Sequence, residues 1–273
     1  MSYSLVQVDD PDDPRLAVFR FSERKLSPRP QRRNDDGAGL FMAEGDLVVE
    51  RALDAGCVPV AALIDATRPL AALPRLQQQI DVFCAGDSLR ALVTGLGMPL
   101  SAVAIFHRPP RPSVQSLTAL AHRLVIVEGV DNPVNVGSIV RNAAGLGWDA
   151  MLLDQTSADP LARRSLRVSM GHALRLPHAK TASLPDELAR LVADGWMVAA
   201  LTPTHNAVDI DTVTAADRTA IVVGSERAGL SADVLAMTTH RLRIPMHVGV
   251  DSLNAAAATA IACFALGAAR PTC

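Results

Sequence analysis

The second half of the chain alternates between short apolar runs and longer segments with helical periodicity, and this alternation limits the possible folds more than any other feature. The apolar runs are bounded by polar residues or glycine, as expected of strands buried on both faces of a sheet. Strand–helix alternation predicts a parallel sheet covered by helices on both faces, with ligand-binding loops at the carboxyl ends of the strands. The predicted strands are Leu124–Glu128, Ala150–Asp154, Met197–Leu201, Ala220–Val223 and, more weakly, Arg241–Ile244. The predicted helices are Val136–Leu146, Leu161–Met170, Leu184–Asp194, Ser231–Met237 and Ser252–Ala269.

A proline-rich segment, His107–Leu117, separates this region from the first part of the chain. Pro109, Pro110 and Pro112 oppose regular helix and favour an extended connector. We therefore expect two domains, residues 1–112 and 113–273. The first domain also alternates, which predicts a small α/β fold. Its predicted elements are a strand that enters a helix over Leu40–Ala55, strands at Val58–Ile64, Asp81–Cys84 and Val103–Phe106, and a helix at Ser88–Leu96.

The composition is that of an ordinary globular protein, with 49% hydrophobic and 20% charged residues. No apolar run is long enough to span a bilayer, and the acidic N-terminus is no signal peptide, so we expect a cytoplasmic protein without a membrane anchor. Cysteine and histidine residues show no metal-ligand spacing, so no metal is expected. The net charge is −2, but the segment Arg15–Arg33 is strongly basic and forms a candidate RNA-binding arm.

Three polar loops follow predicted strands of the second domain. The first carries Asn135, Gly137 and Arg141, with Asn135 at the expected N-cap of a helix and Arg141 about one turn after Gly137. The second reads GSERAGLS, from Gly224 to Ser231. The third reads IPMHVGVDSLN, from Ile244 to Asn254, where Ser252 is the expected helix cap. Each loop alone is an ordinary turn, and their occurrence together in this order indicates a single site.

These three loops resemble the signature motifs of the SpoU (TrmH-like) branch of the SPOUT RNA methyltransferases. The resemblance covers roughly Arg123 to Arg270, and the segment Ser157–Pro177 is similar to the family's segment between motifs. Upstream, Leu40–Leu53 resembles the start of the family's small RNA-binding domain, which is similar to ribosomal protein L30e. The resemblance implies an α/β SPOUT domain with a C-terminal trefoil knot, a homodimer and S-adenosyl-L-methionine as cofactor.

The resemblance also implies roles for individual residues in methyl transfer to a ribose 2′-hydroxyl. Arg141 matches the position assigned to deprotonating or orienting that hydroxyl. Because a guanidinium is a poor base, we prefer a role in which Arg141 binds the adjacent phosphate and stabilises the developing negative charge. A general-base role for Arg141 stays open. Asn135 fixes the loop and Arg141 or contacts the nucleotide, and Glu226 holds Arg141 or reaches across the dimer. Ser252 and Asn254 lie near the target phosphate and ribose. The cofactor-binding residues are Gly224, Ser225, Ile244, Met246 and Leu253.

The RNA substrate is expected to be ribosomal RNA in preference to tRNA, and Arg163, Arg164 and Arg167 are candidates for contacts with its phosphates. An alternative is a non-catalytic RNA-binding or ribosome-assembly factor on the same fold, which the presence of Arg141, Glu226, Ser252 and Asn254 opposes. A second alternative, a nucleotide-dependent oxidoreductase, lacks its glycine fingerprint. Titration with S-adenosylmethionine would test the first alternative, and absence of NAD binding would exclude the second.

Overall fold

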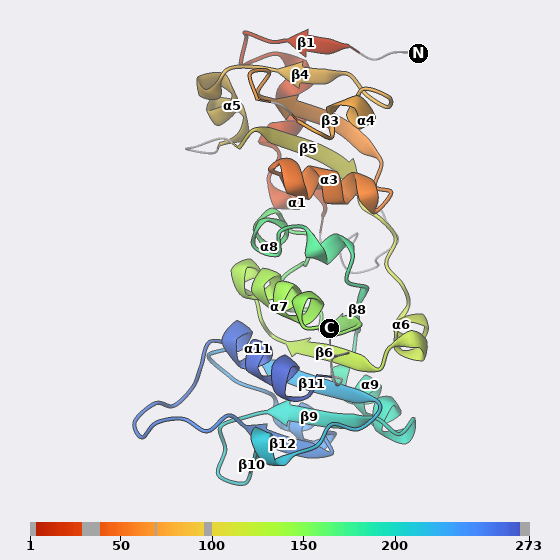
Figure 1. Ribbon diagram of the computed structural model, residues 1–273, viewed down its shortest axis with the longest axis vertical. Coiled ribbons are helices and arrows are strands. Elements are labelled where there is room, and N and C mark those ends of the chain that lie inside the picture. The colour runs from red at the N-terminus through yellow and green to blue at the C-terminus, as the bar shows by residue number, and fades with distance from the viewer. Residues whose placement is uncertain (1–3, 29–38, 69, 96–99, 268–273) are drawn as a thin grey trace, which may run out of the picture. The chain divides into compact units, whose positions relative to one another are not determined.

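A computed structural model describes residues 4–28, 39–68, 70–95 and 100–267 (Figure 1). The chain divides into two compact units. The first unit contains Met1–Pro110 together with the later segment Leu161–Arg175, and the second contains Arg111–Pro160 and Leu176–Cys273. The division between Pro110 and Arg111 lies within the proline-rich segment, whereas the expected second domain of residues 113–273 is interrupted by residues 161–175.

The first unit is built on a five-stranded mixed sheet with the order β1-β4-β3-β5-β2. Strands β1, β4 and β3 run parallel, and β5 pairs antiparallel with both β3 and β2. The small α/β fold expected of this region is therefore confirmed. The strands are β1 (Leu5–Gln7), β2 (Leu40–Glu44), β3 (Pro59–Ile64), β4 (Val82–Cys84) and β5 (Ala102–His107); the helices are η1 (Pro14–Arg20), α1 (Glu23–Leu26), α3 (Asp46–Asp54), α4 (Leu73–Leu76), α5 (Asp87–Thr94), α8 (Arg163–Val168) and η2 (His172–Leu174).

Helix α8 packs within the first unit because two carboxylates of that unit bind it. Glu44, at the end of β2, forms an ion pair with Arg163, and its second oxygen lies 4.0 Å from Arg167. The carboxylate of Glu23 accepts a hydrogen bond of 2.7 Å from the backbone N–H of Arg163, which caps a helix that has no side-chain cap of its own. Arg163 is thus used inside the fold, contrary to the expected RNA contact, whereas Arg164 and Arg167 are exposed.

The second unit is built on a seven-stranded sheet, and all its strands are parallel, as predicted. The strand order is β10-β12-β9-β11-β6-β7-β8 (Figure 1). The strands are β6 (Arg123–Glu128), β7 (Ala150–Leu153), β8 (His178–Lys180), β9 (Met197–Leu201), β10 (Val208–Asp209), β11 (Thr219–Gly224) and β12 (His240–Arg243). The helices are α6 (Val114–Leu120), α7 (Pro133–Gly145), α9 (Leu184–Ala193), η3 (Ile210–Thr212), α10 (Ala232–Ala236) and α11 (Ala255–Ala265).

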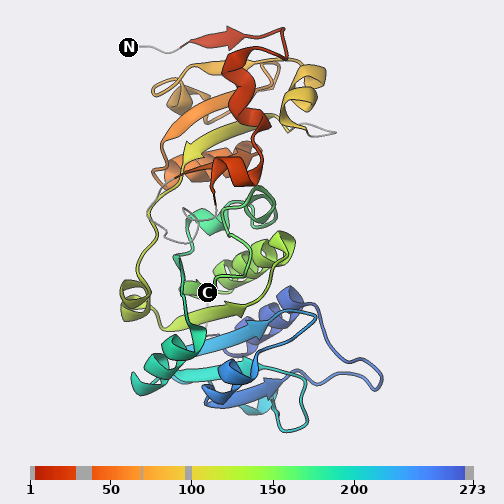
Figure 2. The same cartoon turned by 180° about the vertical axis from the view of Figure 1, so that it is seen from behind.

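Helices cover both faces of this sheet, as the continuous apolar runs predict. On one face Leu117 of α6, Leu188 of α9 and Val234 of α10 share a core with Leu124 and Ile126 of β6. Their alternating neighbours on β6 are also fully buried and face the opposite side, where α7 packs against α11 (Figures 1 and 2). A hydrogen bond of 3.0 Å from the Trp148 indole N–H to the Cys263 carbonyl joins the end of α7 to α11.

The sequence analysis missed two short strands of this unit, the three-residue helix η3 and helix α6. Strands β8 and β10 have three and two residues, too few to show a pattern. Helix α6 begins inside the segment expected to be extended, because the prolines end at Pro112 and the Ser113 hydroxyl then accepts a hydrogen bond of 3.1 Å from the Ser116 backbone N–H.

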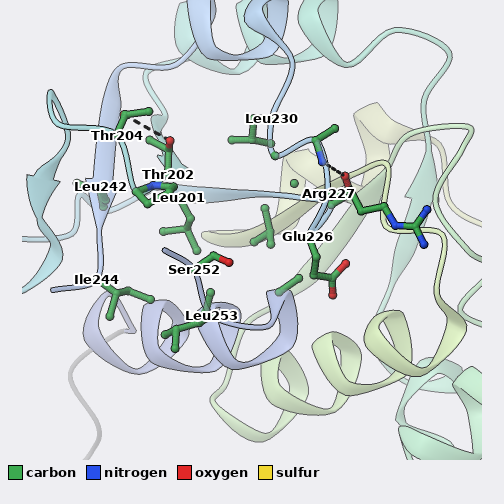
Figure 3. Close-up of a pocket in the computed structure, with 18 of the residues that line it drawn as sticks. Leu201, Thr202, Thr204, Glu226, Arg227, Leu230, Leu242, Ile244, Ser252 and Leu253 are labelled. Atoms are coloured by element: carbon green, nitrogen blue, oxygen red, sulfur yellow. Dashed lines mark hydrogen bonds between the residues drawn. The ribbon is translucent and has the colours of Figure 1, made fainter. Parts of the chain in front are cut away.

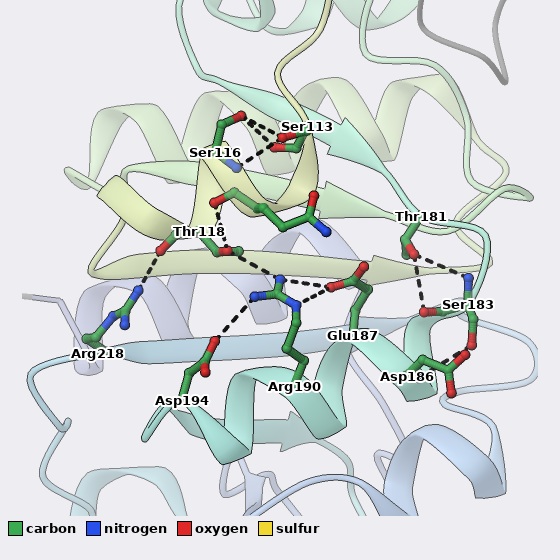
Figure 4. A network of polar contacts seen from close by, with 11 residues as sticks. Ser113, Ser116, Thr118, Thr181, Ser183, Asp186, Glu187, Arg190, Asp194 and Arg218 are labelled. Atoms are coloured by element: carbon green, nitrogen blue, oxygen red, sulfur yellow. Dashed lines mark hydrogen bonds and ion pairs between the residues drawn. The ribbon is translucent and has the colours of Figure 1, made fainter.

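Polar contacts fasten α6 to the amino edge of the sheet (Figure 4). Arg218 donates to the Thr118 carbonyl at 2.5 Å, and its guanidinium lies 4.4 Å from the centre of the Trp196 ring. Arg190 donates to the Thr118 hydroxyl at 3.3 Å and pairs with Glu187 on its own helix. These contacts hold the start of the second unit on the side of the sheet opposite to the strands' carboxyl ends.

Cys57, Cys84 and Cys263 are buried free thiols, and burial raises the pKa of Cys57 to about 11. Among the described residues, no helix is long and apolar enough to cross a membrane, and no group of histidine, cysteine and acidic side chains is arranged as metal ligands. Part of the expected basic arm, residues 29–33, lies outside the described residues. Closer to the N-terminus, Arg15 and Arg20 pair with Asp13 and Asp12.

Candidate active site

The three polar loops of the second unit all leave the carboxyl edge of the parallel sheet, as the strand–helix alternation predicts. They follow β6, β11 and β12, which end at Glu128, Gly224 and Arg243. The Glu128 carboxylate accepts hydrogen bonds of 2.9 and 2.7 Å from the backbone N–H and hydroxyl of Ser231, which caps α10. The loop after β11 is therefore fastened to the end of β6, and the first two loops cannot separate without breaking these bonds.

A cluster of three side chains, one from each loop region, lies at this edge. The Asn135 amide donates a hydrogen bond to Oε1 of Glu226. The Asn254 amide donates to Oδ1 of Asn135 at 3.0 Å and to the same Glu226 oxygen at 3.4 Å. Asn135, Glu226 and Asn254, hereafter the amide–carboxylate cluster, were all expected to be site residues, and the fold brings them into contact.

The hydrogen bonds of Asn254 show that its amide orientation is fixed by the backbone. Its Oδ1 accepts from the backbone N–H groups of Ala256 and Ala257 at 2.9 and 3.3 Å, so Asn254 is the N-cap of α11. Its NH₂ group must then point toward Asn135 and Glu226. The expectation that Ser252 caps this helix is wrong, because the helix begins only at Ala255.

Helix α7 also begins at a different residue from the one predicted. Asn132 is its N-cap and accepts a hydrogen bond of 2.9 Å from the Val134 backbone N–H, and Pro133 occupies the first helical position. Proline suits that position because its missing N–H would have no partner inside the helix. Asn135 is consequently a buried residue of the first helical turn, and its side chain is available to bind Glu226.

Arg141 is exposed on α7, six positions after Asn135. It forms no hydrogen bond or ion pair with any other residue in the described part of the chain. The expectation that Glu226 holds Arg141 is not met within one chain, because the bonded oxygen of Glu226 accepts from the two amides. The guanidinium is therefore free to bind a molecule from outside the chain.

A cavity of about 410 Å³ lies beside the amide–carboxylate cluster (Figure 3). Its walls are mostly apolar, and the expected cofactor-binding residues Gly224, Ser225, Ile244, Met246 and Leu253 all line it. Ser252 lines it too, and Figure 3 shows this side chain between the apolar wall and Glu226. Since Glu226 belongs to both the cavity wall and the cluster, a molecule in the cavity would lie next to the polar residues of all three loops.

Gly224 and Ser225 shape the loop that closes this cavity. A Cβ atom at Gly224 would lie 2.4 Å from the backbone carbon and oxygen of Gly229, so only glycine lets the loop fold back this tightly. The Gly229 N–H donates to the Ser225 carbonyl at 2.9 Å, and the Ala228 N–H donates to the Ser225 hydroxyl at 3.2 Å. The side chain of Ser225 therefore builds the turn, in addition to lining the cavity.

The sequence analysis missed the contribution of the loop after β9 to this cavity. Leu201, Thr202, Pro203 and Thr204 line it, and the Thr202 N–H donates to the Leu242 carbonyl at 2.9 Å. Their position was the available signal, because they follow the carboxyl end of a predicted strand, as the other three loops do. Leu230, Leu235, Leu242, Ala255 and Ala258 complete the apolar wall.

Asp154, at the end of β7, organises the loop that follows β6. It accepts hydrogen bonds from the Gly129 backbone at 3.1 Å and from the Ser157 hydroxyl at 2.5 Å. Burial by itself raises the pKa of this carboxyl, but the hydrogen bonds from Ser157, Thr156 and Gly129 outweigh burial and lower it below its usual value. Asp154 is therefore a charged anchor for the start of the Asn135 loop.

Comparison with known proteins gives one consistent result. The SpoU rRNA Methylase family profile matches residues 122–264. The chain is 42% identical over 260 residues to an uncharacterized tRNA/rRNA methyltransferase of Mycobacterium bovis, covering 93% of this chain and 89% of that protein. It is 28% identical to the 23S rRNA (guanosine(2553)-2'-O)-methyltransferase RlmP of Bacillus subtilis, covering 87% of this chain and 91% of that one.

Solved structures share the fold over nearly the whole chain. An rRNA methyltransferase from Sinorhizobium meliloti, crystallised with bound AdoMet, superimposes with a TM-score of 0.78 at 23% identity, covering 96% of this chain and 97% of that one. The methyltransferase AviRb from Streptomyces viridochromogenes, in complex with AdoMet, gives a TM-score of 0.73 at 21% identity and covers 92% and 94%. The predicted α/β architecture is thereby confirmed, whereas the trefoil knot stays a prediction.

Proposed function

The chain belongs to the SpoU rRNA methylase family, and from this premise we propose that it transfers a methyl group from S-adenosyl-L-methionine to a ribose 2′-hydroxyl of ribosomal RNA. The observation that carries the proposal is the amide–carboxylate cluster. Asn135, Glu226 and Asn254 come from three separate loops, are hydrogen-bonded to one another, and lie beside a mostly apolar cavity. A protein that only bound RNA would not need this pocket next to its polar edge.

The cavity fits the proposed cofactor in size and in chemistry. Its volume of about 410 Å³ lies in the range of small-molecule sites. Leu242, Ile244, Met246 and Leu253 would enclose the adenine and methionine portions, while the backbone of residues 224–229 offers N–H and C=O groups. When bound, S-adenosylmethionine supplies a methyl group on a positively charged sulfur. Glu226 would then place a negative charge next to the reaction site.

The residues of the cluster suit a reaction that needs alignment more than acid–base power. Methyl transfer to oxygen requires the hydroxyl, the methyl carbon and the sulfur to lie in line. Asn135 and Asn254 have fixed orientations because each is bonded on both its oxygen and its nitrogen side. We assign Arg141 to the phosphate beside the target ribose, where its charge also stabilises the developing oxyanion. Ser252 would contact the ribose.

The choice of ribosomal RNA rests on similarity and on the first unit. The Bacillus subtilis relative is named for 23S rRNA, although at 28% identity. The first unit adds a separate small α/β fold with exposed arginines, including Arg164 and Arg167, that suits a large structured RNA. With such a substrate, the protein would act in the cytoplasm.

We also propose that the second unit forms a homodimer through α7 and α11. Ile261 and Phe264 of α11 are 39% and 69% exposed, and together with Ala257 they form an apolar stripe at helical spacing. Val134 of α7 is a further exposed apolar side chain on the helix that packs against α11. An apolar stripe of this kind marks an interaction surface. Light scattering should give twice the chain mass, and Phe264→Glu should give a monomer.

Methyl transfer with labelled S-adenosylmethionine tests the function directly. The acceptors are ribosomal RNA and tRNA from a strain that lacks the gene, and the modified position is mapped by its resistance to alkali, since a methylated 2′-oxygen cannot cleave the chain. We expect one resistant position in ribosomal RNA. Labelling of a base, labelling of tRNA alone, or no transfer despite cofactor binding would each contradict the proposal.

Arg141→Ala tests the assigned mechanism within the same assay. We expect unchanged S-adenosylmethionine affinity by calorimetry and a loss of transfer of about 100- to 1,000-fold, as for other preorganised charge-stabilising groups. Arg141→Lys should also fail, because a point charge does not reproduce a planar fork. Arg241→Ala, which removes a half-buried cation from β12, is the control and should retain activity. Normal turnover by Arg141→Ala would remove this residue from the mechanism.

A further inference from the structure

Most arginine and lysine side chains of the second unit form ion pairs or hydrogen bonds with other residues of the same unit. Arg111 forms an ion pair of 2.7 Å with Asp159, Arg243 pairs with Asp209, and Arg190 pairs with Glu187. Arg123 and Arg218 donate to backbone carbonyls, as does Lys180. Among the described residues of this unit, only Arg141, Arg227 and Arg241 have no such partner, and of these Arg141 and Arg227 are exposed.

Arg227 is held at the tip of a rigid turn. The turn is closed by the bond from the Gly229 N–H to the Ser225 carbonyl, and its inner side is filled by the Ser225 hydroxyl, which accepts from the Ala228 N–H. The backbone of Gly224 passes so close to Gly229 that a Cβ atom at position 224 would not fit. Arg227 is one of the residues that line the cavity, but Figure 3 shows its guanidinium extending away from the apolar wall. A charged side chain is thus presented outward by a fixed backbone.

The two exposed, unpartnered arginines come from the elements that form the amide–carboxylate cluster. Arg227 directly follows Glu226, and Arg141 lies six residues after Asn135, about 9 Å along the axis of α7. Because Asn135 and Glu226 are hydrogen-bonded to each other, the two segments that carry these arginines meet at the cluster. Within the described residues, no carboxylate pairs with either of them.

We propose that Arg227 binds a backbone phosphate of the RNA next to the target nucleotide, as a second guanidinium contact besides Arg141. The inference rests on the proposed RNA methyltransferase function and adds a residue to which the motif resemblance gives no role. Arginine suits the task because its planar fork matches a phosphate and stays charged. Arg227 does not belong to the amide–carboxylate cluster, and its role is to orient the RNA. Its loss therefore weakens RNA binding more than it slows methyl transfer.

The experiment compares Arg227→Ala, Arg227→Lys and the control Arg241→Ala in the full chain. RNA binding is measured at several salt concentrations, alongside methyl transfer and S-adenosylmethionine affinity. We expect Arg227→Ala to raise the KM for RNA on the order of tenfold with little change in kcat at saturating RNA. The slope of log affinity against log salt should become shallower by about 0.7 to 0.9, the value of one lost phosphate contact. Arg227→Lys should keep the slope and lose part of the affinity.

The outcomes separate this inference from the proposed function. If the unaltered protein methylates no RNA, the proposed function fails. If it does, but Arg227→Ala shows the same KM and salt slope as Arg241→Ala, the phosphate contact is overturned. A drop in S-adenosylmethionine affinity alone would place Arg227 on the cofactor, and dissociation of the dimer alone would place it on the second subunit; either result also overturns the inference.

Discussion

Glu44 of the first unit and Glu226 of the second are both carboxylates bound by residues far away in the sequence, yet their surroundings are opposite. The Glu44 side chain is 1% exposed and is paired with Arg163, with Arg167 nearby. Glu226 is exposed at the carboxyl edge of the parallel sheet and is bound by two neutral amides. A buried carboxylate needs a cation, whereas one at the edge can be oriented by amides and keep its charge for a ligand. The ion pair of Glu44 stabilises the fold, whereas the hydrogen bonds of Glu226 leave its negative charge available to interact with a bound ligand.

The same contrast explains why residues 161–175 belong to the first unit. Leu161 and Leu166 are fully buried, and Arg163 forms an ion pair with the buried carboxylate of Glu44. A fragment that began near Arg111 would keep this segment but lose its partners. The first unit therefore needs a segment from the second half of the chain, and experiments on the site are best done with the full protein.

The largest expected effect is on the buried ion pair. Arg163→Met leaves Glu44 buried without its main partner, and we expect the free energy of unfolding to fall by about 3 kcal/mol. This value is at the lower end of the range for broken buried ion pairs, because the Arg163 side chain is 25% exposed. Urea unfolding of the full chain measures it. Arg164→Met, which alters the exposed neighbour, should change stability by less than about 0.5 kcal/mol. Equal stability of the two variants would show that Glu44 does not need Arg163.

An intermediate effect is expected at the edge cluster, where capping and chemistry can be separated. Asn254→Ala removes both the cap of α11 and the donors to Glu226 and Asn135, and should cost about 1 kcal/mol of stability and on the order of 100-fold in methyl transfer. Asn254→Ser should recover the stability, because serine is a good N-cap, but not the activity, because its hydroxyl cannot replace the amide donors. If Asn254→Ser recovered both the stability and the methyl-transfer activity, the only role of Asn254 would be to cap α11.

The smallest effect concerns Asp154, whose pKa is lowered by its hydrogen bonds despite burial. Because the pKa in the folded protein lies below the unfolded value of about 3.9, the carboxylate stabilises the fold fully above that value, and this contribution is lost as the pH falls below about 4. Asp154→Asn should therefore be less stable than the original protein by about 1 kcal/mol at pH 7. The difference should shrink toward pH 3 in urea unfolding, and a constant difference would exclude the charge as its cause.

Much of the second unit could be predicted from its sequence because periodicity and burial coincide there. Strands β6, β7, β9 and β11 follow from apolar runs that are buried on both faces, whereas β12 has only one buried residue and was the weaker prediction. The loops at the carboxyl ends of the strands follow from parallel topology. The loops that carry Asn135, Glu226, Ser252 and Asn254 stood out because they follow predicted strands, and the resemblance to the SpoU motifs then implied roles for these four residues. The same reasoning placed Gly224, Ile244 and Met246 at a ligand cavity, which they line.

Only the tertiary structure decided which residues bind one another. Glu226 binds Asn135 and Asn254 instead of Arg141, and Asn254 caps α11 in place of Ser252, because hydrogen-bond partners depend on distances between elements that no sequence spacing gives. The assignment of Arg163 to the first unit has the same cause, since a buried carboxylate 119 residues earlier in the chain determines it. Sequence patterns report the burial of each element, whereas pairing between distant polar side chains arises only when the chain has packed.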